Sequence, residues 1–112
     1  MGLDQYLYER TTEQDKLRDI QLEIKLKEGE KRGYIESIDD QLYESEIFRW
    51  RKDYKLQYYF LKKYSVENCK YFELDVEALE KLGENLEGYN EAIRIAKESI
   101  HKGNRVYYYY WD

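Results

Sequence analysis

The stretch Arg105-Val-Tyr-Tyr-Tyr-Tyr-Trp111 sets five aromatic side chains in a row. In a β-strand, successive side chains point to opposite faces of the sheet. Tyr108 and Tyr110 would then lie on one face. The second face would carry Tyr107, Tyr109 and Trp111. The stretch therefore predicts a two-faced strand, one face covering helices as core and the other either buried or exposed as a binding surface.

Three further segments have strand patterns. Leu3 to Tyr8 alternates and is rich in aromatics, which predicts an N-terminal strand whose Tyr6 and Tyr8 pair with the last strand. The apolar residues Ile20, Leu22, Ile24 and Leu26 recur at period two, which is typical of a half-buried strand. The two glycines of 28–33 predict a turn, and 34–38 would return as the second arm of a hairpin.

Two longer segments follow helical periodicity. The first predicted helix runs from about 42 to 64. Its core-facing residues would be Ile47, Trp50, Tyr54, Tyr58 and Leu61. A short strand at 71–74 and an N-cap at Asp75 would lead into a helix over 76–102. Its apolar stripe is Leu79, Leu82, Leu86, Tyr89, Ile93, Ala96 and Ile100. Gly83 is a candidate position for a bend or break.

These elements predict one α+β domain over residues 1–112. A small antiparallel sheet, made of the N-terminal strand, the hairpin and the C-terminal strand, would pack on the two helices. Although 38 % of the residues are charged, a hydrophobic content of 42 % that includes 14 tyrosines excludes a disordered chain. Tyrosine supplies most of the apolar area.

Charge and targeting signals narrow the function classes. The net charge of −5 argues against a protein that coats nucleic acid in general. The single cysteine allows no internal disulfide and fits a reducing compartment. Neither a signal peptide nor an apolar run long enough to span a bilayer is recognisable. We therefore expect a cytoplasmic protein.

No catalytic or metal-binding pattern emerges from the sequence. His101 is the only histidine, and no motif places it beside Cys69 or a serine. A zinc site would need those two residues and distant carboxylates, without a close ligand pair. Asp39 and Asp40 are more typical of capping and solvation. The sequence predicts no enzyme, no cofactor and no metal.

A row of glutamates follows the second predicted helix. Its members are Glu77, Glu80, Glu84, Glu87, Glu91 and Glu98. On one continuous helix they would lie opposite the apolar stripe and span roughly 32 Å at 1.5 Å per residue. The row is either the solvated face of an amphipathic helix or a phosphate-like surface that binds a basic nucleic-acid channel of another protein.

The predicted helix over 42–64 offers an alternative contact surface. The segment 41–70 holds seven basic and four acidic residues. Aromatic residues interleaved with Arg49, Lys52 and Lys55 suit single-stranded nucleic acid, although the same aromatics coincide with the predicted core stripe. Tyr59 lies off that stripe. The candidate exposed aromatics are Tyr59, Tyr107, Tyr109 and Trp111.

Several stretches resemble a known group of proteins. The opening MGLDQYLYER resembles the start of small uncharacterised bacteriophage and prophage proteins that typically begin Met-Gly-Leu-Asp-Met-Tyr-Leu. WRKDYKLQYYF and ENCKYFELDVEALEKL resemble later segments of the same group, so that the likeness covers about two thirds of the chain. Segment 11–45 has no counterpart, and no site residue carries over. The resemblance implies an accessory protein of a mobile element.

Together these observations predict a phage-encoded protein that binds a host protein or ribonucleoprotein complex through its acidic surface. The expected partner is a defence or nucleic-acid-handling complex, including a Cas9-type effector, which would make the protein an anti-CRISPR-like inhibitor. One alternative is a nucleic-acid-binding accessory that uses the basic segment. Another is a structural protein, monomeric or homodimeric, whose leucine stripe pairs two chains.

Overall fold

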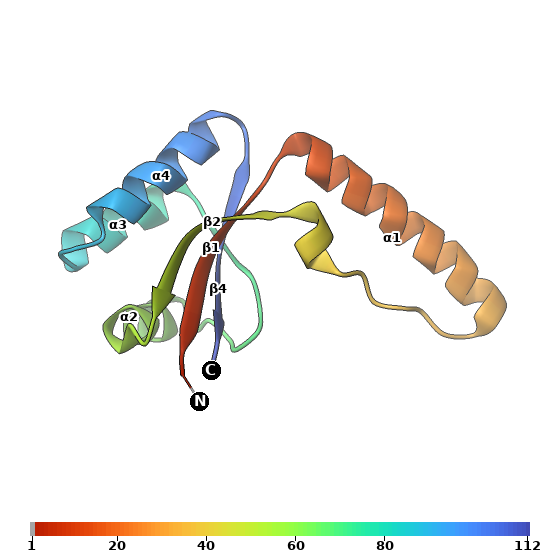
Figure 1. Cartoon of the computed structure of the whole chain (residues 1–112), viewed down its shortest axis with the longest axis horizontal. Helices are drawn as coiled ribbons and strands as arrows, with labels where there is room; N and C mark the ends of the chain where they lie inside the picture. The colour runs from red at the N-terminus through yellow and green to blue at the C-terminus, as the bar shows by residue number, and fades with distance from the viewer. Residues whose placement is uncertain (1) are drawn as a thin grey trace.

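The computed structural model describes residues 2–112, with a four-stranded antiparallel sheet, helices on one of its faces, and one long helix that projects away from it (Figure 1). In chain order the elements are β1 (Asp4–Arg10), α1 (Thr12–Arg32), the 3₁₀ helix η1 (Asp40–Tyr43), β2 (Ser45–Arg51), α2 (Tyr54–Tyr64), β3 (Phe72–Leu74), α3 (Val76–Asn85), α4 (Asn90–His101) and β4 (Arg105–Trp111). The predicted α+β class is confirmed.

The two aromatic strands predicted at the ends of the chain form the centre of the sheet. The strand order is β2-β1-β4-β3. β1 and β4 pair along their whole length, from Asp4 opposite Trp111 to Arg10 opposite Arg105. Because both strands have a neighbour on each side, their backbone groups are largely satisfied within the sheet.

The core lies between one face of the sheet and helices α2, α3 and α4. Tyr108 is fully buried there and stacks on Phe60 of α2, with 4.1 Å between ring centroids. Its hydroxyl donates to the side-chain oxygen of Gln5, whose amide donates to the Asp53 carbonyl at 2.8 Å. A tyrosine can therefore occupy the middle of the core because its polar atom has a buried partner.

The predicted hairpin over 20–38 is wrong, because residues 12–32 form the helix α1. A capping box between Thr11 and Gln14 starts the helix, and Gly33, at φ 82°, ends it in the left-handed conformation. Lys, Glu, Leu and Gln dominate between the caps, and all four favour helix. Ile20 and Ile24 belong to the period-two run, but together with Leu17 they also follow the spacing of a helix. The alternation alone therefore did not distinguish a strand from a helix.

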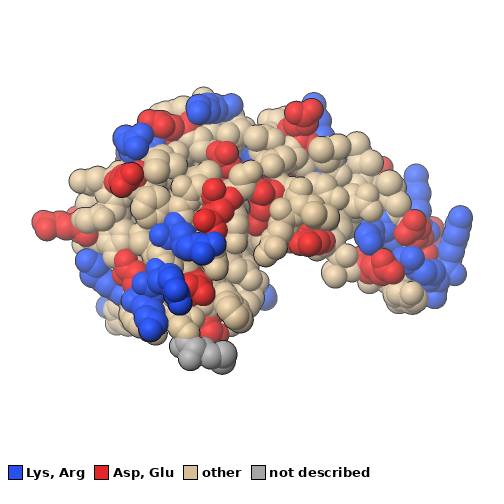
Figure 2. All heavy atoms as spheres, in the orientation of Figure 1, with Lys and Arg blue, Asp and Glu red and all other residues tan. Residues whose placement is uncertain are grey.

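The projecting part of the molecule, residues 11–44, is called the arm. It consists of α1, a return segment over 33–39, and η1, which leads into β2 (Figure 1). Asp39 caps η1 by accepting from the Gln41 amide. Charged side chains gather at the far tip of the arm, while its flank towards the sheet is mostly uncharged (Figure 2). The sheet and the other helices are called the body.

The predicted helix over 42–64 is half wrong, because residues 45–51 form the edge strand β2 and only 54–64 form the helix α2. Pairing with β1 selects the extended form for this β-branched and aromatic segment. Asp53 then caps α2 by accepting from the Leu56 amide. Tyr54 and Tyr58, which were predicted to be core, are 53 % and 64 % exposed.

The predicted helix over 76–102 is two helices. α3 ends before Leu86, and the turn that follows contains Gly88 at φ 94°, so the break lies after Gly83 rather than at it. At Gly83 the two helices approach closely, since a Cβ there would lie 3.3 Å from Ile93 Cδ1. Most of the apolar stripe is buried, and Asp75 caps α3, as predicted. A stripe buried in the core cannot pair two chains.

Candidate functional site

The sheet face opposite the helices is paved with tyrosine. β1 contributes Tyr6 and Tyr8, which stack at 5.4 Å. Tyr109 of β4 lies beside both, at 6.2 Å and 6.0 Å, as the cross-strand pairing predicted. Tyr71, just before β3, adds a fourth ring 4.9 Å from Tyr109. The rings hold one another in place, so this surface is preorganised.

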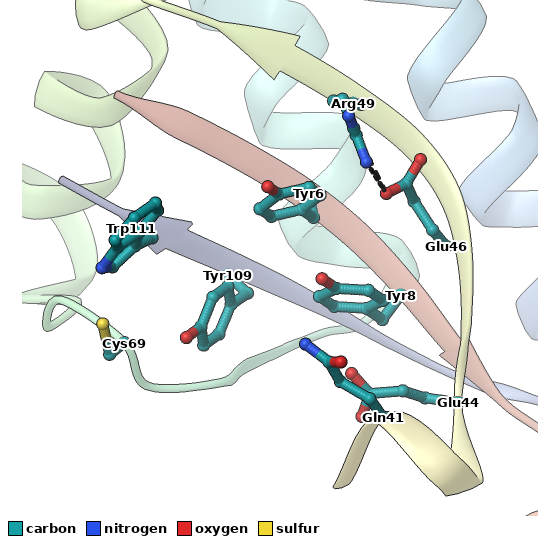
Figure 3. A pocket seen from close by; sticks show the side chains of 9 residues that line it. All are labelled: Tyr6, Tyr8, Gln41, Glu44, Glu46, Arg49, Cys69, Tyr109 and Trp111. Atoms are coloured by element: carbon teal, nitrogen blue, oxygen red, sulfur yellow. Dashed lines mark hydrogen bonds and ion pairs between the residues drawn. The ribbon is translucent and has the colours of Figure 1, made fainter. Parts of the chain in front are cut away.

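Three of these rings, Tyr6, Tyr8 and Tyr109, form the floor of an open groove of about 510 Å³ (Figure 3). Gln41 and Glu44, from η1 and the residue after it, close one end. Trp111 lies at the other end, 53 % exposed. The complete lining is Tyr6, Tyr8, Gln41, Glu44, Glu46, Arg49, Cys69, Tyr109 and Trp111. A groove of this kind offers aromatic faces, phenol donors and carboxylates to one ligand.

Glu44 is the buried acidic group of the groove. Its carboxylate accepts from the Tyr71 hydroxyl at 2.7 Å and from Arg10 Nη2 at 3.2 Å. Burial raises the pKa of Glu44, while both hydrogen bonds oppose that rise. Burial first and Glu44 second raise the pKa of Tyr8 to about 12. Burial and the nearby Cys69 raise the pKa of Tyr109 to about 12. These phenols therefore remain protonated donors at neutral pH.

Two rings of the open face already carry a guanidinium. Arg49 lies over Tyr6 at 5.1 Å and is held there by hydrogen bonds to Glu46. Arg10 and Arg105 flank Tyr107, at 4.9 Å and 5.5 Å. Within residues 2–112, no Lys or Arg lies over Tyr8, Tyr109 or Trp111 in this way. The free rings have the chemistry to take a further cation.

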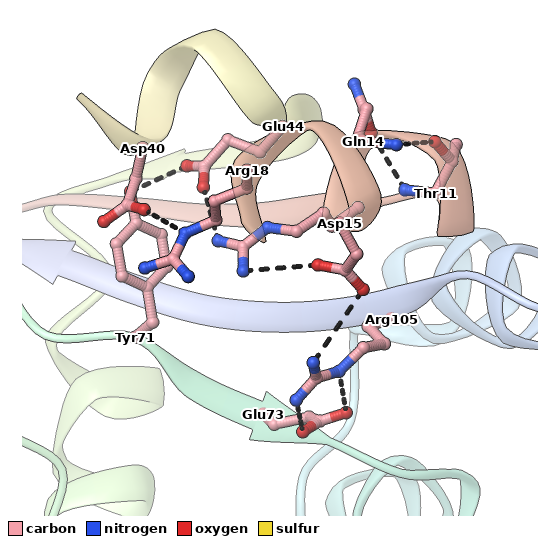
Figure 4. A network of polar contacts seen from close by, with 10 residues as sticks. Thr11, Gln14, Asp15, Arg18, Asp40, Glu44, Tyr71, Glu73 and Arg105 are labelled. Carbon is pink, nitrogen blue, oxygen red and sulfur yellow. Dashed lines mark hydrogen bonds and ion pairs between the residues drawn. The ribbon is translucent and has the colours of Figure 1, made fainter. Parts of the chain in front are cut away.

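A polar network fixes the end of the groove to the root of the arm (Figure 4). Arg10, at the end of β1, contacts Glu44 and also Asp15 in the first turn of α1, the latter at 3.6 Å. Arg18 of α1 binds Asp40 of η1 at 2.7 Å. Asp15 is shared with Arg105, at 3.8 Å. The contacts tie α1, η1 and the two central strands together, so η1 keeps its place as the groove's end wall.

The four aromatic residues that the sequence predicted to be exposed lie in different environments. Tyr109 and Trp111 line the groove together. Tyr107 is buried, which corrects its assignment as exposed. Tyr59 is only partly buried, but it packs against Phe60 and Tyr64 in the core rather than standing free. Its hydroxyl is buried without a hydrogen-bond partner among the residues described.

The six glutamates do not form one straight row, because the helix that would carry them is broken. Glu77, Glu80 and Glu84 lie on α3, Glu87 lies in the turn, and Glu91 and Glu98 lie on α4. Three of them form ion pairs: Glu77 with Lys81, Glu80 with Lys97, and Glu98 with Arg94. The others are Glu84, Glu87 and Glu91, close to the α3–α4 turn. The prediction of one continuous phosphate-like row of roughly 32 Å is therefore wrong.

The three basic residues proposed for nucleic acid do not share a helix either. Arg49 lies on β2 and faces the groove. Lys52 lies between β2 and α2, beside Gly2. The Lys55 ammonium group lies over Tyr89, a buried ring of the helical face, at 5.2 Å. Arg49 and Lys55 thus lie on opposite sides of the sheet and cannot follow one strand of nucleic acid together.

Cys69 and His101 lie in different parts of the fold. Cys69 lies on the rim of the groove, and His101 is exposed in the last turn of α4. Within residues 2–112, no group of three or more acidic, histidine or cysteine side chains is arranged to hold a metal ion. Over the same residues, no helix has the length and apolarity to cross a membrane.

Sequence reasoning missed the acidic end of the groove. Glu44 and Glu46 were assigned to the start of a helix, and only the pairing of β2 with β1 brings them beside Tyr8. The period-two spacing of Tyr6 and Tyr8 did predict that their side chains lie on one face of the strand. Comparison of the chain with protein-family models, curated proteins and solved structures gave no match.

Proposed function

We propose that the protein acts by binding another protein, and that the tyrosine groove receives a basic, arginine-containing segment of that partner. The observation that carries the proposal is the tyrosine-lined groove itself, in which the rings of Tyr109 and Trp111 carry no cation and the carboxylates of Glu44 and Glu46 supply negative charge. Tyrosine, tryptophan and arginine are the residues that dominate binding energy at protein interfaces.

The protein's own arginines indicate what the groove can accept. Arg49 is seated over Tyr6 and paired with Glu46, which combines an aromatic face with a carboxylate. A partner guanidinium over Tyr109 would likewise meet an aromatic face, with negative charge from Glu44 and Glu46 in the same groove. Desolvated cation–π contacts contribute about 2 kcal/mol each. The net charge of −5 favours encounter with a basic partner.

The class of partner follows from the resemblance to phage proteins. Proteins that handle nucleic acid present basic surfaces to phosphate. We propose a host nucleic-acid-handling or defence complex, of the kind that an anti-CRISPR-like inhibitor binds, as the source of the basic segment. Glu84, Glu87 and Glu91 near the α3–α4 turn would add a second acidic contact in place of the straight row.

The proposal is tested with defined peptides and the emission of Trp111. In a Trp50→Phe background, Trp111 is the only tryptophan. We expect a short arginine-rich peptide to change its emission with an affinity that falls as salt rises. A matched glutamate-rich peptide and an oligothymidine probe should give no change. Binding of the oligonucleotide alone would favour the nucleic-acid alternative, and equal binding of both peptides would overturn the proposal.

Two variants locate the contact. Tyr109→Leu removes the central ring of the groove but keeps apolar volume, and it should weaken peptide binding at least about tenfold, as loss of an interface hot spot does. Tyr58→Ala removes a more exposed ring on α2, outside the groove, and should leave binding unchanged. If the two variants behave alike, the groove is not the site.

A further inference from the structure

α1 presents an unpartnered apolar face. Leu17, Ile20 and Ile24 are 54 %, 55 % and 42 % exposed, and their spacings of three and four residues place them in one row. The return segment covers a different side of the helix, where Arg18 binds Asp40, Lys25 binds Glu36, and Gly29 packs against Ile35. The apolar row therefore stays open along a helix roughly 32 Å long.

Charged residues continue this row at both ends. Glu13 precedes Leu17 by four residues, and Lys27 follows Ile24 by three. The complete row is Glu13, Leu17, Ile20, Ile24, Lys27 and Lys31. Its steps of four, three, four, three and four are the seam spacing of a two-stranded coiled coil. The three apolar positions form its centre.

The ion pairs of the arm distinguish the two sides of α1. On the side near the return segment, Arg18, Lys25 and Arg32 are all paired within the chain. On the seam side, five charged residues have no ion-pair partner among residues 2–112. These are Glu13, Lys16, Glu23, Lys27 and Lys31. These seam-side charges therefore form no ion pair within the described part of the chain.

We infer that α1 pairs with α1 of a second copy of this chain, in antiparallel orientation about a two-fold axis near Ile20. In that register Ile20 faces its own counterpart, and Leu17 faces Ile24 of the second copy. Glu13 then meets Lys27, and Lys16 on the flank meets Glu23, each contact occurring twice. Four of the five unpaired charges gain an opposite charge in one arrangement.

A parallel pair would place Glu13 against Glu13 and Lys27 against Lys27, so the charges select the antiparallel form. The geometry of the arm allows it. α1 leaves the body at its N-terminal end, and the return segment occupies another side (Figure 1). Two antiparallel helices would therefore hold the two bodies at opposite ends, with both tyrosine grooves free.

Sedimentation velocity at protein concentrations from about 5 to 500 µM tests the inference, because dimer formation depends on concentration. A concentration-dependent dimer is expected. Ile20→Lys places two lysines at the two-fold axis and should weaken association at least about tenfold. Leu26→Lys, on another side of α1, is the matched control and should leave association unchanged. Far-UV circular dichroism verifies that each variant keeps its helix.

A charge exchange identifies the orientation. Glu13→Lys and Lys27→Glu should each weaken the dimer, and the double variant should restore it. Residues 13 and 27 are about 21 Å apart along the helix and cannot pair within one chain. A monomer at every concentration, a dimer that survives Ile20→Lys, or a double variant that fails to recover would each overturn the inference.

Discussion

The body and the arm of this molecule are stabilised in different ways. In the body, aromatic rings and leucines from distant segments converge, as where Tyr108 stacks on Phe60 under a hydrogen bond to Gln5. In the arm, a single highly charged helix lies on a short return segment, and large apolar side chains such as Ile20 and Leu42 face solvent. Long-range packing fixes the body, whereas local helix signals and ion pairs fix the arm.

The difference bears on function. The groove lies on the body, but its end wall is η1, which belongs to the arm. The arm's root is therefore part of the groove wall, and the rest of the arm lies outside the groove. Changes in the body should cost stability, and changes along the arm should cost association instead.

The largest effect is expected for Tyr108→Ala. The ring is fully buried, and its loss leaves a cavity beside Phe60 and an unsatisfied Gln5 oxygen. We expect the free energy of unfolding to fall by about 3–5 kcal/mol, measured by urea denaturation. Tyr58→Ala, at an exposed position of α2, should change it by less than about 0.5 kcal/mol. Similar losses in both variants would contradict the assignment of the core.

Glu44→Ala tests the junction between the two regions. It leaves the buried Arg10 guanidinium without its shorter carboxylate contact and removes the acceptor of the Tyr71 hydroxyl. We expect a loss of about 3 kcal/mol, as for a broken buried ion pair. The matched control is Glu36→Gln at the far end of the arm, where the ion pairs are exposed and their loss should leave stability nearly unchanged. A neutral Glu44→Ala would show that the junction does not hold the arm.

Alkaline pH should affect the body before the arm. Burial raises the pKa of eight tyrosines, namely Tyr8, Tyr59, Tyr71, Tyr89, Tyr107, Tyr108, Tyr109 and Tyr110. A raised pKa in the folded state contributes stability below about pH 10, and that stability is lost as pH rises towards the folded value. For Tyr8 and Tyr109 that value is about 12.

Absorbance at 295 nm follows tyrosinate formation, and far-UV circular dichroism follows unfolding. We expect the phenols of the body to ionise late, together with cooperative unfolding between about pH 10 and 12. If all 14 tyrosines ionised near pH 10 while the protein stayed folded, the eight tyrosines named above would not be buried.

The smallest effect on stability is expected from removing α1 and the return segment, with η1 left in place. Replacing residues 12–39 with a short glycine–serine linker keeps Gln41 and Glu44 and leaves every strand intact. Because α1 packs mainly on η1, we expect the body to lose less than about 1 kcal/mol, apart from the loss of helix signal. Loss of cooperative unfolding in this variant would show that the arm is part of the core.

The sequence predicted the centre of the body better than it predicted the arm and the edge of the sheet. Alternation in 105–111 and 3–8 identified the two central strands because each has one face against helices. The edge strand β2 was taken for a helix, since its extended form depends on pairing with β1. α1 was taken for a hairpin because Leu22 and Leu26, which lie off the helical row of Leu17, Ile20 and Ile24, complete a period-two alternation.

The groove was only partly predictable. Tyr109, Trp111 and Arg49 were identified from composition and spacing, and all three line it. Glu44 was not, because its position beside Tyr8 depends on where η1 ends and β2 begins. The break at Gly88, which divides the glutamate row, depends on the packing of α4 against α3 and not on helix periodicity.

The most direct test of the groove as a binding surface is amide and aromatic chemical-shift mapping on titration with the arginine-rich peptide. We expect the largest changes at Tyr8, Tyr109 and Trp111, with the seam of α1 and the exposed ring of Tyr58 unchanged. Changes spread evenly over the acidic surface, or confined to the arm, would contradict a binding site on the open face of the sheet.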